Sequence, residues 1–127
     1  MDFETDKHLI SVSGTEKRGE PAIMAKIYQG KISDIIDWLS RDGYVGGTYK
    51  SVINAYYYRD LVLMSKMAAA LGKAEDIAFF QKKAAAVKKS FQDMFWDRNN
   101  KRYRDSDETE HVSLYVNIFF VSFRLGG

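Results

Sequence analysis

The chain has 127 residues, 46% of them hydrophobic and 28% charged, which is enough for one modest core. Its formal net charge is only +2, and basic residues are interleaved with acidic ones, so a nucleic-acid partner is disfavoured. The absence of cysteine excludes disulfides and thiol catalysis. No apolar run approaches the roughly 20 residues that span a bilayer, and the amino terminus lacks a secretory pattern, so we expect no membrane partner and assign no compartment.

Residues 1–36 carry the weakest structural signals of the chain. Pro21 is placed to open a short helix that runs to Tyr28. Ser33 and Asp34 have the composition of a helix cap or a turn. The role of this region stays open.

Two long helices are predicted in the middle of the chain, because apolar residues recur there at spacings of three and four. The first begins at Val52 and is closed by Gly72, and the second runs from Ile77 to Met94. The brief connection requires the helices to be antiparallel, and the expected fold class is all-α. The apolar side of the first helix is predicted to carry Ile53, Tyr57, Leu61, Met64, Ala68 and Leu71.

The segment from Phe95 to Asp105 is typical of a helix end, an asparagine-centred turn and a short extended return. A third helix is predicted from about Ser113 to Leu125. Since that helix is apolar nearly all round, it is expected to have neighbours on most sides.

Aromatic residues supply the first candidate ligand contacts. Trp38 offers a flat apolar face that suits stacking on a pyranose, and the neighbouring Asp37 can accept hydrogen bonds from sugar hydroxyls. The plainer alternative is a tryptophan of the core. In the run Tyr56–Tyr58, a helix separates successive rings by about 100°, so at least one ring points away from the core. Ordinary interhelical packing is the alternative there.

An acidic group, residues 105–110, lies beside His111 and has the residue types that acid–base chemistry needs. An inverting glycosidase requires an acid and a base about 6.5–9.5 Å apart. Acids near arginines are more often simply solvated, and solvation is what we expect here. His111 itself has the alternatives of capping a helix, bonding to a neighbour or lying exposed.

Metal and cofactor sites are not expected. His8 and His111 are far apart in sequence, and the acids lack the alternating spacing of a calcium loop. The glycines from Gly43 to Gly47 lack the lysine and hydroxyl of a nucleotide-binding loop.

Three separated runs carry a family resemblance: Asp37–Trp38, the run 54–58, and the run that starts at 95–97 and leads through Tyr103 and Asp105 to 110–117. In this order and spacing they resemble the later part of the catalytic domain of the α-L-rhamnosidases. The resemblance covers residues 37–127. It implies an all-α fold of helical hairpins from an (α/α)6 barrel, of six-hairpin glycosidase type, and an inverting hydrolase acting on a rhamnose-containing glycan or glycoside. It further implies that residues 1–127 are a fragment of one catalytic domain.

The resemblance also implies site residues. The substrate-binding candidates are Asp37, Trp38, Tyr56, His111 and Asn117. No catalytic residue is transferred, because the general acid of the family lies upstream and its general base downstream, in motifs that this sequence does not match. The isolated chain is therefore expected to be inactive. Tyr115 stands where the family often has a second histidine, and Arg124 where it usually has glycine.

Other interpretations stay open. The chain is also compatible with a free-standing helical module that binds a partner or dimerises through its apolar third helix. A helical-barrel glycosidase for another sugar, such as a glucuronyl or trehalose-type substrate, is a further alternative.

Overall fold

The computed structural model describes residues 7–9 and 48–125, and within them the chain is mainly helical. The elements are α2 (Ser51–Ala70), α3 (Ala74–Phe95), β1 (Trp96–Asp97), β2 (Arg102–Tyr103) and α4 (Leu114–Ser122). The strands of this part of the chain are two residues long and form a single antiparallel hairpin. The all-α prediction is thereby confirmed. The predicted features at Pro21 and at Ser33–Asp34 lie outside the described residues.

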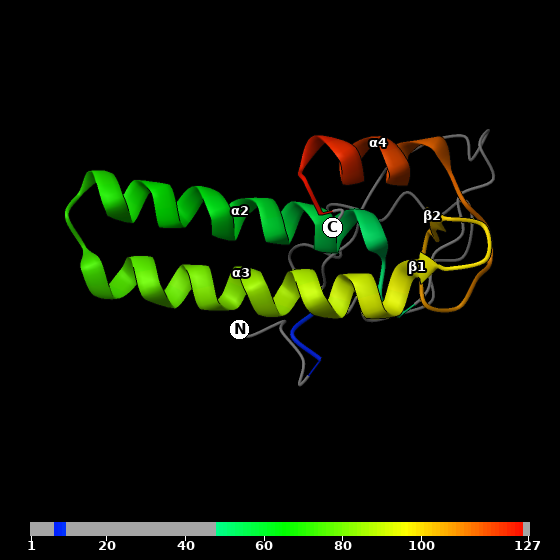
Figure 1. Ribbon diagram of the computed structural model, residues 1–127, viewed down its shortest axis with the longest axis horizontal. Helices are drawn as coiled ribbons and strands as arrows, with labels where there is room; N and C mark the ends of the chain where they lie inside the picture. Colours follow the sequence, from blue (N-terminus) through cyan, green and yellow to red (C-terminus); the bar gives the residue numbers. More distant parts are fainter. Residues whose placement is uncertain (1–6, 10–47, 126–127) are drawn as a thin grey trace, which may run out of the picture.

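Helices α2 and α3 form the long antiparallel hairpin that the sequence predicts, lying side by side along most of their length (Figure 1). Gly72 closes α2 with a φ of 66°, its N–H donating to Ala69 O at 3.1 Å. The next N–H, of Lys73, donates to Ala68 O at 2.9 Å. This is the Schellman arrangement, in which a left-handed residue satisfies the last carbonyls of a helix.

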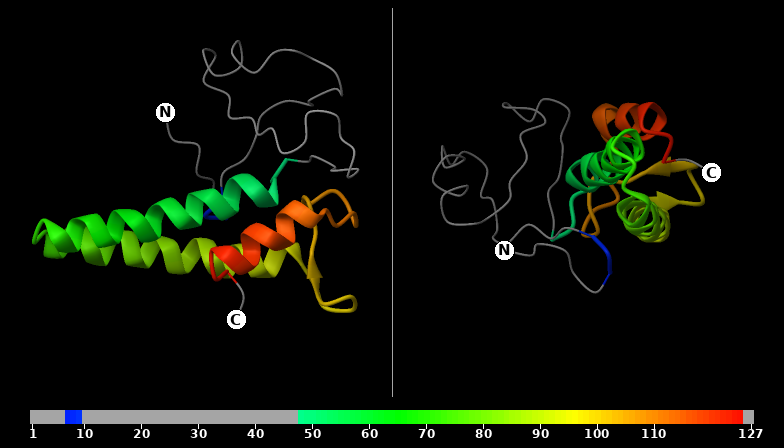
Figure 2. Two further views of the ribbon diagram at one scale, coloured as in Figure 1. Left: turned by 90° about the horizontal axis from the view of Figure 1, so that it is seen from above. Right: turned by 90° about the vertical axis from the view of Figure 1, so that its left-hand side faces the viewer.

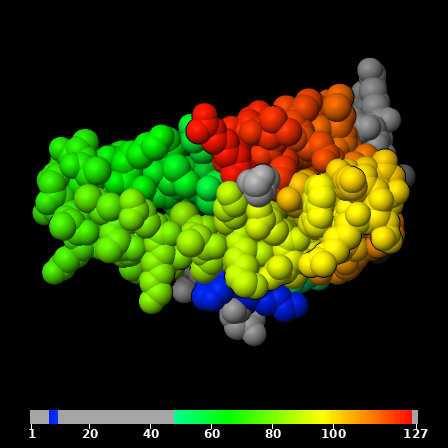
Figure 3. Space-filling model, viewed as in Figure 1, coloured from blue at the N-terminus to red at the C-terminus, as the bar shows by residue number. Residues whose placement is uncertain are grey.

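The predicted apolar side of α2 is buried only in part, which corrects the expectation for its far half. Leu61 and Ala68 are buried, whereas Met64 and Leu71 are exposed, Leu71 to 72%. The reason is geometric: α3 covers one side of α2, while α4 and the β-hairpin lie only near the Ser51 end (Figure 3). The apolar side chains of α2 therefore extend over a longer stretch of the helix than the other described segments cover.

The β-hairpin is organised by Asp97, as the asparagine-centred turn predicts. Its Oδ1 accepts from the N–H groups of Asn99 at 3.0 Å and Asn100 at 3.3 Å, and its Oδ2 accepts from Asn100 Nδ2 at 2.6 Å. The Asn100 side chain is the main reason that the pKa of Asp97 lies below its usual value. The turn places Trp96 opposite Tyr103, with their rings 4.6 Å apart.

An aromatic cluster joins the elements into one core. Phe91 of α3 is fully buried, with ring centroids 4.8 Å from Phe95, 5.7 Å from Tyr103 and 5.3 Å from Phe120. These contacts connect α3, β2 and α4 through a single side chain. Leu9, distant in sequence, is also fully buried in this core. Burying each such side chain contributes about 1.5–3 kcal/mol.

Helix α4 ends earlier than predicted, at Ser122 rather than near Leu125. The chain turns because Arg124 takes a left-handed conformation, with a φ of 56°. The N–H of Arg124 donates to Val121 O at 3.2 Å, and that of Leu125 donates to Phe120 O at 3.1 Å. This second Schellman turn buries the Leu125 side chain completely. It also gives a physical reason for a glycine at position 124.

Helix α4 lies over the first half of α2, on the same end of the molecule as the β-hairpin (Figure 2). Val116 and Phe120 are its buried residues. The expectation of neighbours on most sides is met on one side only among the described segments. The apolar side chains that α4 leaves exposed are Leu114, Tyr115, Ile118 and Val121.

We predict that the two helix-closing turns respond in opposite ways to substitution. Gly72→Ala lowers the free energy of unfolding by about 1 kcal/mol, because a left-handed backbone disfavours any Cβ, although space is open around the added methyl. Arg124→Gly raises it by up to about 1 kcal/mol for the same reason. Urea denaturation of each variant measures the change. Arg124→Ala is the control, since it removes the side chain and keeps the backbone cost; equal stabilities of the two Arg124 variants would contradict the account.

Tyr103 gives a prediction about alkaline stability. Burial raises the pKa of its phenol to about 12 from an ordinary 10.0. The neutral phenol therefore contributes stability that is fully present below pH 10 and is lost as the pH rises toward 12. Tyr103→Phe removes this group and leaves the other ionisable side chains in place. We expect the stability of the native chain relative to that variant, from urea denaturation, to fall over this pH range; a constant difference would contradict the burial effect.

Candidate functional site

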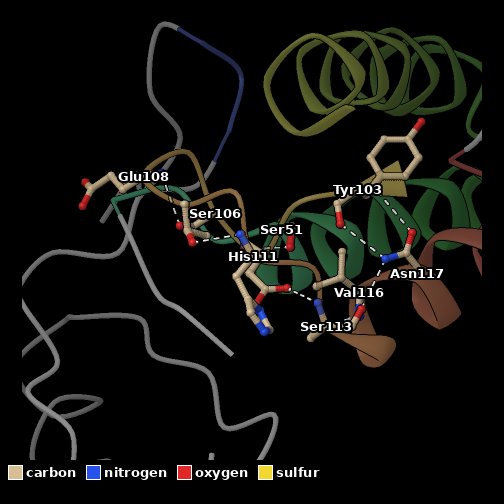
Figure 4. A network of polar contacts seen from close by, with 10 residues as sticks. Ser51, Tyr103, Ser106, Glu108, His111, Ser113, Val116 and Asn117 are labelled. Atoms are coloured by element: carbon tan, nitrogen blue, oxygen red, sulfur yellow. Dashed lines mark hydrogen bonds and ion pairs between the residues drawn. The ribbon is translucent and has the colours of Figure 1, made fainter. Parts of the chain in front are cut away.

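The polar centre of the structure is Asp105, whose carboxylate is fully buried. Its Oδ1 accepts from the Ser113 N–H at 2.7 Å, and its Oδ2 lies 2.5 Å from Nδ1 of His111. The backbone N–H of Asp105 donates to the His111 carbonyl at 2.9 Å. Figure 4 shows His111 between Ser106 and Ser113 in this network. Asp105, at the start of the loop, is thus tied to His111 and Ser113 at its end, just before α4.

The same residue also starts α2. The carbonyl oxygen of Asp105 accepts from the Ser51 N–H at 2.9 Å and from Ser51 Oγ at 2.8 Å. Lys50, the residue before α2, provides no side-chain cap, so this carbonyl supplies a partner for an N–H at the beginning of the helix. A bridge between Lys50 and Ser106 extends the contact. Asp105 therefore connects the amino ends of α2 and α4.

The burial of Asp105 corrects, for this residue, the expectation that the acids of residues 105–110 are simply solvated, whereas Glu108 and Glu110 are exposed. An extended strand sends alternate side chains to the same face, and β2 sends Tyr103 into the core. Asp105, however, lies beyond the end of β2 in a bend, and Ser106 beside it is buried as well, so strand alternation does not account for its burial. No local pattern of the sequence marks Asp105 as buried, because its partners Ser51 and Ser113 lie on other segments.

The other acids of the group also bind neighbouring segments. Asp107 Oδ1 accepts from the Tyr49 N–H at 2.9 Å. Glu108 Oε1 accepts from the backbone and the hydroxyl of Thr48, at 3.1 and 2.7 Å. Glu110 pairs with Arg104 at 2.8 Å. These acids therefore hold the loop against the start of α2 and the β-hairpin.

His111 is a candidate site residue whose ring is held on its buried side and partly exposed on the other. Its side chain is 35% exposed, while the carboxylate that holds it is fully buried. Its backbone is fixed as well, because its N–H donates to Thr109 Oγ1 at 3.0 Å. Within residues 7–9 and 48–125, Nε2 of the ring makes no hydrogen bond. The arrangement holds one ring nitrogen and leaves the other without a hydrogen bond from these residues.

Asn117 has its amide bound to the backbone. Its Oδ1 accepts from the Tyr103 N–H at 3.2 Å, and its Nδ2 donates to Tyr103 O at 3.3 Å and to Ser113 O at 3.2 Å. Both amide hydrogens are thereby occupied, and one lone pair of Oδ1 remains. The side chain ties α4 to β2. A sugar contact by Asn117 stays a prediction.

The remaining predicted site residues lie elsewhere. Tyr56 is on α2, with its ring 5.1 Å from Phe119 of α4 and 5.2 Å from Phe123, the residue after α4, and 46% of Tyr56 is exposed. Its ring therefore takes part in interhelical packing. Asp37 and Trp38 lie outside the described residues. His111 precedes α4 and Asn117 lies in its first half, each with contacts of its own, whereas Tyr56 packs against the other end of the helix.

Among residues 7–9 and 48–125, no group of three or more histidine or acidic side chains is placed to hold a metal ion. In the same part of the chain, no helix combines the length and apolarity needed to cross a membrane.

The comparison with protein families decides the classification. Residues 12–122 match the bacterial alpha-L-rhamnosidase 6 hairpin glycosidase domain. The chain belongs to this family. The helical hairpin α2–α3 agrees with a domain built of such hairpins, and the family predicted from the sequence motifs is confirmed. No curated protein matches the chain closely enough to count as a relative.

We predict that Asn117 acts as a structural tie between α4 and β2. Asn117→Ala lowers the free energy of unfolding by about 2–3 kcal/mol, because partly buried backbone groups of Tyr103 lose their partners. Asn117→Asp is expected to be at least as unstable, since it turns an acceptor toward the carbonyls of Tyr103 and Ser113. Urea denaturation of both variants provides the measurement. An aspartate variant as stable as the native chain would contradict these contacts.

Proposed function

We propose that this chain is part of the catalytic domain of an enzyme that hydrolyses terminal α-L-rhamnosyl bonds with inversion. The observation that carries the proposal is the family match over residues 12–122. Membership of a glycosidase family makes a carbohydrate the natural substrate class. The proposal includes three points: that the sugar is rhamnose, that the reaction inverts the anomeric centre, and that residues 1–127 are a fragment of one catalytic domain.

His111 is the described residue that we assign to the sugar. Its ring is partly exposed at the start of α4, and its orientation is fixed from the buried side by Asp105. Sugar recognition requires such rigid polar groups, because each hydroxyl must meet a partner at a defined place. We keep Asp37, Trp38 and Tyr56 as further proposed contacts.

The catalytic acid and base are proposed to come from residues outside this chain. The Asp105 carboxylate is fully buried and bonded to His111 and Ser113, so it is not available to a glycosidic oxygen. Asp107 and Glu108 bind backbone or hydroxyl groups of residues 48 and 49. These contacts support a structural role for the acidic loop.

The exposed apolar side of α4 supports one alternative, a helical module that associates with another copy of itself. Leu114 and Val121 are exposed to 65% and 78%, and a surface of this kind is common at protein contacts. Association through α4 stays a prediction. A definite oligomer without any affinity for sugars would favour this alternative.

The proposal is tested on the natural protein, captured from its source cells with an antibody raised against this chain. We expect turnover of an aryl α-L-rhamnoside in preference to aryl glucosides and glucuronides, because the domain family is that of the α-L-rhamnosidases. The anomer released first, followed by NMR, is expected to be inverted.

The isolated chain serves as the matched control in the same assay and is expected to show no turnover above buffer. Preference for another sugar would reject the rhamnosyl assignment. Absence of any glycosidase activity in the captured protein would reject the enzymatic proposal. Turnover by the isolated chain would show that it contains its own acid and base.

A further inference from the structure

The contacts of Asp105 determine which nitrogen of His111 carries a proton. An ionised carboxylate only accepts hydrogen bonds. Its Oδ1 is occupied by the Ser113 N–H at 2.7 Å, and its Oδ2 faces His111 Nδ1 at 2.5 Å. Nδ1 must therefore be the donor. In a neutral imidazole the other nitrogen then carries a lone pair and acts as an acceptor.

The surroundings of the ring leave that acceptor available. The His111 side chain is 35% exposed, and no group of residues 7–9 or 48–125 bonds to Nε2. The backbone contact to Thr109 and the two contacts to Asp105 restrict the position of the ring. A fixed acceptor at a partly open surface suits a ligand hydroxyl, which can donate.

We propose that Asp105 is a positioning residue, which holds His111 as the Nδ1–H tautomer so that Nε2 accepts a hydrogen bond from a sugar hydroxyl. The sugar part of this inference rests on the proposed function, whereas the tautomer is measurable without any sugar. Asp105 itself never touches the ligand, because it is fully buried. It acts through the imidazole.

Replacing Asp105 with asparagine reverses the polarity of the site. The single amide oxygen of asparagine must remain opposite the Ser113 N–H, which has to donate to it. The amide nitrogen then faces Nδ1 of His111, so Nδ1 has to accept and the proton moves to Nε2. Asp105→Asn therefore changes the outer nitrogen from an acceptor to a donor with almost no change in shape.

NMR of the imidazole nitrogens tests this directly on the whole chain, at about pH 9, well above the ordinary histidine pKa of about 6.5. The sequence has two histidines, His8 and His111, so the signals that remain in His8→Asn belong to His111. Asparagine is chosen because it tolerates the φ of 57° at position 8. We expect the Nδ1–H tautomer of His111 in the native chain and the Nε2–H tautomer in Asp105→Asn. A native Nε2–H tautomer, an exchanging mixture, or an unchanged tautomer in a folded Asp105→Asn would overturn the proposal. If the variant does not fold, the native tautomer alone decides.

The sugar contact is tested by titrating the same chain with L-rhamnose, D-glucose and D-glucuronate while following His111 Nε2. His111→Asn is the matched control: its amide nitrogen takes the place of Nδ1 and can donate to Asp105, but it has no outer nitrogen. We expect L-rhamnose to shift the Nε2 signal, and His111→Asn to fold as the native chain does while losing the sugar-induced changes at the start of α4. A response only to another sugar would retain this inference and reject the rhamnosyl proposal. No response to any sugar would reject the ligand role of Nε2.

Discussion

The burial of one carboxylate constrains the whole described structure. A charged group without access to water is tolerated only if every lone pair that needs a partner finds one. The Asp105 carboxylate meets this requirement through the Ser113 N–H and the His111 ring. Its backbone carbonyl accepts a hydrogen bond from the Ser51 hydroxyl. The chain must therefore bring the start of α2, the acidic loop and the start of α4 to one place. The aromatic contacts of Phe91 with Tyr103 and Phe120 act in the same region and exclude water from it.

Burial determines which polar groups of this network bond only within the protein and which group faces the surface. The groups on the inner side of the loop are occupied by each other, and Asn117 adds contacts to the backbone of Tyr103. His111 stands at the boundary, with one nitrogen inside the network and the other facing outward. A ligand contact at this position is rigid without help from the ligand, which lowers the entropic cost of recognition. Because the chain belongs to a glycosidase family, we propose a sugar hydroxyl as the partner of this nitrogen.

Local features of the structure could be predicted from the sequence, because they depend on neighbours within one or two turns. The helix end at Gly72 and the asparagine turn after Asp97 are of this kind. The position of Arg124 shows the limit: its left-handed conformation ends α4 early, and the apolar pattern continues past it to the buried Leu125. Apolar periodicity shows which face of a helix is buried, but it does not show at which residue the helix ends.

The candidate site was less predictable, because its geometry depends on segments far apart in sequence. The contact between Ser51 and Asp105 joins residues 54 positions apart, and no local pattern encodes it. Tyr56 could be placed on a helix, but its packing against Phe119 depends on where α4 lies. Composition alone suggested solvated acids, whereas Asp105 is buried by contacts with the starts of α2 and α4. Family resemblance, and not periodicity, selected His111.

The most direct test of the central role of Asp105 is native-state hydrogen exchange at the amides of Ser51 and Ser113, which donate to it. If Asp105 holds the structure together, these amides exchange only when the whole chain unfolds, with the same free energy as the interior amides of α3. Exchange at a much lower free energy, while α3 remains protected, would show that the loop opens by itself and would contradict the account.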